Sequence, residues 1–165
     1  MRIRNRRLGM IDLFEEALVR LPGGLLGFEG HEEYFLLDID GTRPFRWLIS
    51  RRDPDLVFAA IPPESFLDGA YRPPISEADR RALELEPGGA VEILALVSPG
   101  ERAGPATANL KGPLVLNPVR RLAKQLIVYG AGPSARHPID PGAGVLQAWP
   151  RAPRAGIRMA GRRAA

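Results

Sequence analysis

Few side chains in this 165-residue sequence have the types and spacing that catalysis requires. The chain has no cysteine, and its two histidines, His31 and His137, are far apart and not spaced as metal ligands on one helix face. Neither Lys111 nor Lys124 precedes Ser or Thr, and no serine lies in a G-x-S-x-G motif. The sequence therefore predicts no catalytic residue, no metal site and no cofactor.

Carboxylates and one amide remain as candidates. Asp53 and Asp55 flank Pro54, a pattern typical of a turn, because Asp bonds the backbone ahead of it and Pro fixes φ. An acid/base or metal-binding role for such a pair is the alternative. Asn109 interrupts an apolar run, where an amide either satisfies the backbone of a β-bulge or contacts a partner.

The elements that would position these residues are mainly strands. Short apolar runs separated by turn residues predict strands at 34–39, 45–50, 56–61, 90–97, 112–116 and 123–129. Their spacing favours a mainly β fold, a single domain built as a small antiparallel β-barrel or sandwich. In the second run Phe45, Trp47 and Ile49 share one face, which we expect to be core, whereas Arg46 and Ser50 share the other.

One or two short helices complete the expected fold. Ser76 can cap a helix through Asp79, and Pro87 ends it. Ala78, Ala82 and Leu85 are its expected inner face. A shorter turn is expected at 64–67.

The basic charge belongs to the ends of the chain. Four Arg lie in residues 1–7 and five follow Trp149, with no acidic residue in either group, so nine of the 23 Lys and Arg are terminal. The rest of the chain has 14 Lys and Arg and all 19 Asp and Glu, which gives it a net charge of −5. An acidic body suits a basic protein better than RNA. We expect a body at 1–140 and a disordered tail at 141–165, rich in Arg, Pro, Gly and Ala. No apolar signal core or membrane span is predicted.

Several motifs resemble those of the flagellar assembly factor FliW family. The quoted stretches are Leu21-Pro22-Gly23-Gly24-Leu25-Leu26-Gly27-Phe28-Glu29, Pro44-Phe45-Arg46-Trp47-Leu48-Ile49-Ser50, Asp53-Pro54-Asp55-Leu56-Val57-Phe58, the stretch from Ala106 to Asn117, Lys124-Gln125-Leu126-Ile127-Val128 and Arg136-His137-Pro138. They follow the family's order over roughly residues 1–140. Arg51 and Arg52 occupy positions that are commonly polar or acidic in the family. Residues after Pro141 match no motif of the family.

The resemblance implies a cytoplasmic, non-enzymatic binding protein. Such proteins bind flagellin, and they also bind CsrA, a small basic homodimer that represses translation of the flagellin message. Capture of CsrA relieves that repression. We expect a monomer that contacts neither nucleic acid nor membrane directly.

The predicted partner-binding residues lie on loops and on one strand pair. They are Phe28, Glu29, Glu32, Asp53, Asp55, Asn109 and Gln125. Two other functions stay open from the residues alone: a nucleic-acid-binding β-barrel that uses the Arg-rich ends, and a carboxylate-dependent hydrolase such as a glycosidase.

Overall fold

The apolar runs of the sequence become strands of one large sheet. The structure is a computed structural model that describes residues 1–6, 8–100, 104–140 and 157–159. Its strands are β1 (Arg2–Asn5), β2 (Gly9–Asp12), β3 (Leu18–Arg20), β4 (Glu33–Ile39), β5 (Arg46–Ser50), β6 (Val57–Ile61), β7 (Glu92–Ser98), β8 (Ala106–Asn117), β9 (Leu122–Gln125), β10 (His137–Ile139) and β11 (Ile157–Met159). Its helices are η1 (Glu15–Ala17) and η2 (Pro63–Ser65), both 3₁₀, and α1 (Glu77–Ala82).

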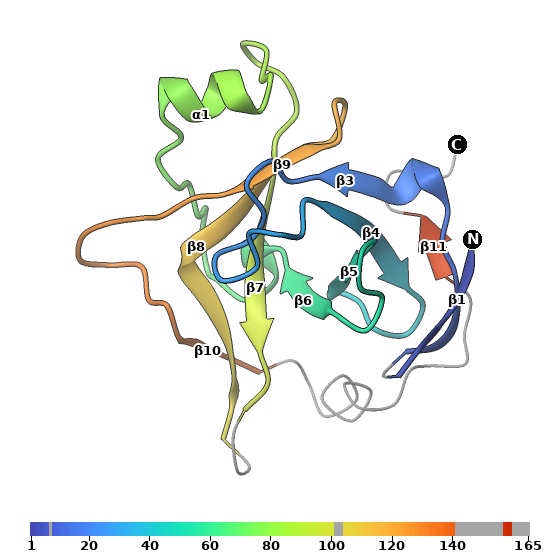
Figure 1. Cartoon of the computed structure of the whole chain (residues 1–165). Coiled ribbons are helices and arrows are strands. Elements are labelled where there is room, and N and C mark those ends of the chain that lie inside the picture. The colour runs from blue at the N-terminus through green and yellow to red at the C-terminus, as the bar shows by residue number, and fades with distance from the viewer. Residues whose placement is uncertain (7, 101–103, 141–156, 160–165) are drawn as a thin grey trace.

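Seven of these strands close into a barrel. Strands β3 to β9 follow one another around a ring, and β9 pairs with both β8 and β3 (Figure 1). The β3–β9 pair is parallel and rests on Arg20 and Leu122, whereas the other neighbours in the ring are antiparallel. This confirms the expected mainly β fold, a small antiparallel barrel with short helices.

The two larger apolar cores lie on the two faces of the sheet. One draws buried side chains from all seven strands of the ring and therefore fills the barrel: Val19, Tyr34, Leu36, Leu48, Ala60, Leu94, Leu114, Leu116 and Ala123. The other lies outside β4 to β8 and is covered by Ile11 of β2 and Ile139 of β10.

Strand β5 is consequently buried on both faces. Phe45, Trp47 and Ile49 belong to the outer core, as expected. The opposite face was expected to be polar and is also buried, because it points into the barrel: Leu48 packs there and Ser50 has no exposed surface. Arg46 on that face pairs with Asp38 at 3.0 Å and Glu92 at 2.6 Å.

Helix α1 begins where the sequence predicts, but it packs differently. Ser76 is its N-cap and its Oγ accepts a hydrogen bond from the Asp79 backbone N–H at 3.1 Å. The expected inner face is wrong in part, since Ala78 and Ala82 are exposed. The helix is too short to bury a face of its own, and Leu83 just beyond it packs against the outside of β8 and β9 instead.

The tail expected to be disordered falls mostly outside the described residues, which omit 141–156 and 160–165. Its described part, β11, pairs antiparallel with Leu37–Ile39 of β4. Strand β3 pairs only with residues 33–35 of β4, so β11 continues the same edge. Within the described residues, no helix is long and apolar enough to cross a membrane.

Candidate partner-binding surface

The histidines and carboxylates of the described residues do not assemble into a metal-binding set. No group of three His, Asp or Glu in this part of the chain is placed to hold a metal ion. His31 Nδ1 is 2.7 Å from Oγ of the buried Ser50, and His137 stacks near Phe66 with ring centroids 5.5 Å apart. Each histidine thus has its own structural contact in a different part of the fold.

Residues 21–32, here called the mouth loop, connect β3 to β4 and cross one end of the barrel (Figure 1). Leu25 is buried in the barrel core, whereas Leu26 is 57% exposed and Phe28 is 38% exposed. At Gly24, φ is +70° and an added Cβ would lie 2.6 Å from the Phe28 carbonyl oxygen, so glycine is required there. The loop therefore closes the barrel while presenting two apolar side chains to solvent.

An aromatic series leads from this loop into the barrel. The Phe28 ring meets Phe58 edge-on with centroids 4.9 Å apart, and Phe58 meets Tyr34 at 6.1 Å. Burial raises the pKa of Tyr34 to about 12. Its hydroxyl has no hydrogen-bond partner among the described residues. Edge-to-face packing on Phe58 therefore holds the Phe28 ring at the surface.

The carboxylates of Glu29 and Glu32 are held by backbone amides. Glu29 Oε1 accepts from the Gly27 N–H and Glu32 Oε1 from the Gly23 N–H, each at 2.9 Å. The Gly27 hydrogen bond lowers the pKa of Glu29. Neither carboxylate has an ion pair with a described residue. Negative charge is therefore fixed beside Phe28.

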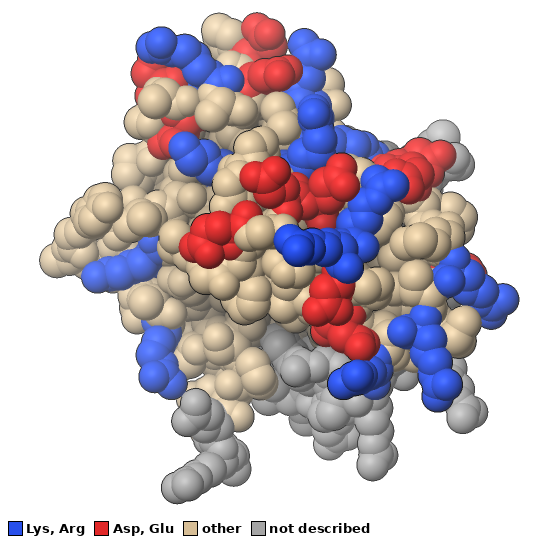
Figure 2. All heavy atoms as spheres, viewed as in Figure 1, with Lys and Arg blue, Asp and Glu red and all other residues tan. Residues whose placement is uncertain are grey.

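A shallow hollow adjoins these carboxylates, and it is lined by Glu29, Gly30, Glu32, Glu33, Arg51 and Arg52. Arg51 bonds Glu15 at 3.0 Å and lies 3.8 Å from Glu33, and Arg52 donates to the Gly30 carbonyl at 3.0 Å. Figure 2 shows acidic and basic side chains gathered at the centre of the same face. The arginines that depart from the family pattern are thus engaged by the mouth loop and its neighbours.

Asp53 and Asp55 lie on the β5–β6 turn, as the sequence predicts. Asp53 Oδ1 accepts from the Asp55 N–H at 3.1 Å, and the Asp53 N–H donates to Ser50 Oγ at 3.2 Å. Asp55 also pairs with Arg6 at 3.0 Å. Its charge is therefore balanced by the β1–β2 hairpin, unlike the charges of the mouth loop.

Asn109 and Gln125 meet at a bulge in β8. The β7–β8 register shifts between Leu94 and Leu96, and Asn109 Oδ1 accepts from the N–H groups of Lys111 and Gly112 at 3.0 and 2.9 Å. A Cβ at Gly112 would lie 2.8 Å from Gln125 Nε2 and 2.9 Å from Asn109 Nδ2. The interpretation of Asn109 as a bulge residue agrees with this geometry, and its contact with a partner stays a prediction.

Gln125 connects this bulge to the mouth loop. Its Nε2 donates to the Gly112 carbonyl at 3.1 Å, and its Oε1 accepts from the Leu26 N–H at 2.9 Å. The next N–H along the loop, that of Gly27, is the one bonded by Glu29. The structure thus brings Gln125, Phe28, Glu29 and Glu32 to one end of the barrel.

Sequence reasoning overlooked three exposed apolar residues near this surface. Leu26, Ile127 and Tyr129 are more than half exposed. The period-two alternation of a strand could have predicted the exposure of Ile127 and Tyr129, because these two residues alternate with Leu126 and Val128, which are buried.

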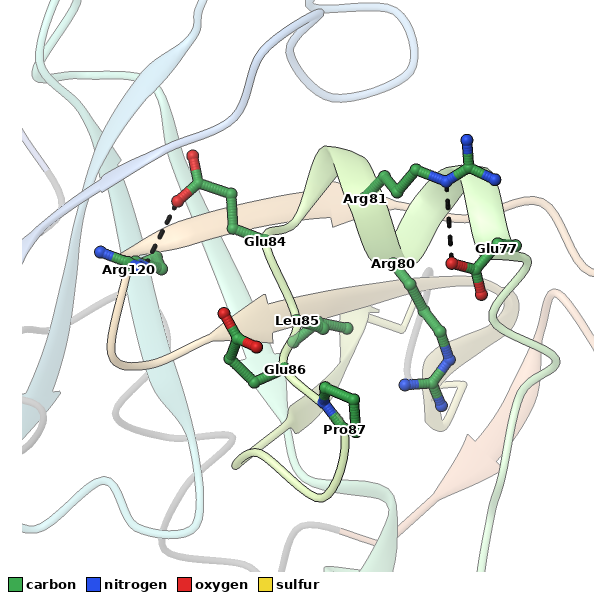
Figure 3. Close-up of a pocket in the computed structure, with 8 residues that line it drawn as sticks. All are labelled: Glu77, Arg80, Arg81, Glu84, Leu85, Glu86, Pro87 and Arg120. Carbon is green, nitrogen blue, oxygen red and sulfur yellow. Dashed lines mark ion pairs between the residues drawn. The ribbon is translucent and has the colours of Figure 1, made fainter.

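A second hollow beside α1 lacks the features of a site. Figure 3 shows two ion pairs on its rim, while Arg80 and Glu86 lie apart from each other, so the charged side chains do not converge on one point. Glu77 lies 3.7 Å from Arg81, and Glu84 lies 3.3 Å from Arg120. These are surface ion pairs of an ordinary kind.

Comparisons with known proteins identify the family. The family model described as FliW protein matches residues 2–139. The flagellar assembly factor FliW of Natranaerobius thermophilus is 35% identical over 140 residues, which cover 84% of this chain and 92% of the relative. The flagellar assembly factor FliW of Geotalea uraniireducens is 33% identical over 138 residues, which cover 84% of this chain and 83% of the relative. A crystal structure of the flagellar assembly factor FliW aligns with a TM-score of 0.75 at 26% identity, covering 87% of this chain and 99% of that chain.

Fold and surface together define a seven-stranded β-barrel with a charged and apolar loop across one mouth. The chain belongs to the FliW family of flagellar assembly factors. The resemblance seen in the sequence motifs is thereby confirmed. The relatives are named as flagellar assembly factors.

Proposed function

We propose that this protein acts in the cytoplasm as a monomer that binds flagellin and also binds CsrA, antagonising it and relieving repression of flagellin translation. The proposal rests on membership of the FliW family and on what the sequence resemblance implies. It also assigns CsrA, the basic partner, to the mouth loop.

The observation that carries this assignment is the state of Glu29 and Glu32. Both carboxylates are oriented by backbone N–H groups and lack an ion pair among the described residues. Both belong to the mouth loop, which also carries the exposed Phe28 ring. Fixed negative charge next to an apolar anchor suits a basic protein, because charge raises the rate of encounter while the aromatic ring provides apolar contact.

Two features weigh against the rival functions. In the N-terminal segment, Arg2 lies 3.6 Å from Asp12 and Arg6 lies 3.0 Å from Asp55, so part of its positive charge is already balanced. A nucleic-acid interface would need that charge free. A glycosidase would need two carboxylates free to act in one cleft. Glu29 and Glu32 line the same shallow hollow, but each accepts a hydrogen bond from the backbone of its own loop.

The test replaces both glutamates by glutamine and measures association with purified CsrA by stopped-flow fluorescence. Glu29→Gln and Glu32→Gln remove charge but keep an oxygen that can accept from Gly27 and Gly23. We expect the association rate of the double variant to fall about tenfold at low salt and the difference to shrink as salt rises.

Asp55→Asn is the matched control, because the charge of Asp55 is balanced by Arg6. We expect it to change the association rate less than the double variant does. Equal rates and equal salt slopes for the wild type and the double variant would move the CsrA surface elsewhere. A wild-type protein that failed to bind either CsrA or flagellin would refute the proposed function itself, because the proposal requires both.

A further inference from the structure

The strand pairing of β8 and β9 continues beyond the end of β9. The Leu126 N–H donates to the Pro113 carbonyl and the Val128 N–H to the Lys111 carbonyl, both at 2.8 Å. Only one bond forms at each pair, because Pro113 has no N–H and the Lys111 N–H donates to Asn109 Oδ1. Residues 126–129, here called the edge segment, therefore lie beyond the assigned end of β9 and continue along β8 with one hydrogen bond at every second residue.

The other side of the edge segment is open. In an antiparallel pair successive N–H groups point to opposite sides, so those of Ile127 and Tyr129 point away from β8. Neither donates a hydrogen bond to a described residue. Strand β3, the next strand of the ring, pairs with β9 only at Leu122. The edge segment also has no Pro, Gly or charged residue, the usual protections of a free edge.

Exposed apolar side chains accompany this open edge. Ile127 is 53% exposed and Tyr129 is 84% exposed, and alternation places both on the face occupied by Gln125. Gln125 Oε1 bonds the N–H of Leu26, whose side chain is exposed as well. The edge segment thus combines free backbone N–H donors with a small exposed apolar surface.

We propose that the edge segment is a docking site for an extended apolar segment of flagellin, which adds to the sheet as a further strand. Strand addition combines main-chain hydrogen bonds with pockets or surfaces for alternate side chains, and both are present here. The choice of flagellin rests on the proposed function, in which CsrA takes the charged mouth loop.

The small size of the apolar surface argues against a second copy of this chain as the occupant. Among the described residues, the large exposed apolar side chains at this end of the barrel are Leu26, Phe28, Ile127 and Tyr129. A stable dimer needs about 800 Å² from each partner, whereas a single added strand needs far less.

The position of the edge segment also links the two partners. Gln125 and Glu29 bond the successive N–H groups of Leu26 and Gly27, so the open edge adjoins the charged surface assigned to CsrA. A flagellin strand with a basic residue at this end would contact Glu29. Bound flagellin and bound CsrA would then exclude each other by direct overlap.

The experiment measures binding of purified monomeric flagellin to the full chain by calorimetry. Ile127→Pro removes the outward N–H but leaves the bonds of Leu126 and Val128 intact. Ile127→Lys keeps the N–H and places a charge on the apolar face. We expect each variant to weaken flagellin binding about tenfold or more.

Val119→Lys is the matched control, since Val119 is another exposed apolar residue, 78% exposed, on the β8–β9 turn. It should leave flagellin binding unchanged. Hydrogen exchange supplies a second measurement: the Ile127 and Tyr129 amides should gain protection when flagellin binds.

The outcomes separate the two proposals. If the wild type binds flagellin and the Ile127 variants bind equally well, with no added protection at Ile127 and Tyr129, the docking site is refuted and the proposed function stands. If the wild type binds no flagellin, both are refuted. Near-UV circular dichroism verifies the fold of each variant, and Ile127→Lys carries the test if Ile127→Pro does not fold.

Discussion

Asn117 joins three parts of the fold, and its replacement tests how the barrel is fastened to α1. The residue is buried, with 4% of its surface exposed. Its Nδ2 donates to the carbonyls of Leu83 and Glu84, both at 2.9 Å, and its Oδ1 accepts from the N–H groups of Val119 and Arg120, both at 3.1 Å. One side-chain amide therefore makes hydrogen bonds to backbone carbonyls of the chain after α1 and to backbone N–H groups of the turn between β8 and β9.

We expect Asn117→Ala to reduce the free energy of unfolding by about 3 kcal/mol. Each lost hydrogen bond contributes about 1 kcal/mol net, and a buried carbonyl left without a partner costs about 1–3 kcal/mol. Val119 and Glu84 are exposed, so water can replace their bonds. Leu83 is buried, so most of the loss comes from its carbonyl.

Urea unfolding followed by circular dichroism measures this loss. Asn117→Asp separates the two halves of the amide, because a carboxylate still accepts from the turn but cannot donate to Leu83 and Glu84. We expect Asn117→Asp to be at least as destabilising as Asn117→Ala. A change below about 0.5 kcal/mol in Asn117→Ala would show that water replaces all four bonds and would refute the reasoning.

Three further predictions concern stability. Ser76→Ala should cost about 1 kcal/mol through loss of the cap of α1, and an unchanged unfolding midpoint would contradict this. The side-chain hydrogen bond from Lys124 lowers the pKa of Asp79 below its ordinary value of 3.8. The stability that Asp79 contributes is therefore present above that pH and is lost as the pH falls through the lowered folded-state pKa. Lys124→Met should make the free energy of unfolding depend less on pH in this acidic range. Tyr34→Phe removes a buried hydroxyl without a partner in the described structure and should raise the unfolding temperature, whereas a lower temperature would reveal an unseen partner.

Local patterns in the sequence determined the elements and the family. Apolar runs predicted β4 to β7 and β9 within a few residues and the second half of β8, and Ser76 with Asp79 predicted the start of α1, because strand alternation and helix capping act over neighbouring residues. The motifs from Leu21 to Pro138 indicated the FliW family. Short elements without an apolar run, such as β1, β2, β3 and β10, were not predicted, since each depends on its pairing partner.

Only the tertiary structure decided which faces are buried and which residues meet. Closure of the ring turned the polar-looking face of β5 inward, so Ser50 is buried against expectation. It also brought Leu26 to Gln125, 99 residues away, and placed Glu29 beside them. No local pattern encodes such a contact, because it results from the pairing of β9 with both β3 and β8. The charged mouth loop and the adjoining open strand edge are therefore properties of the closed barrel, even though their residues can be read individually from the sequence.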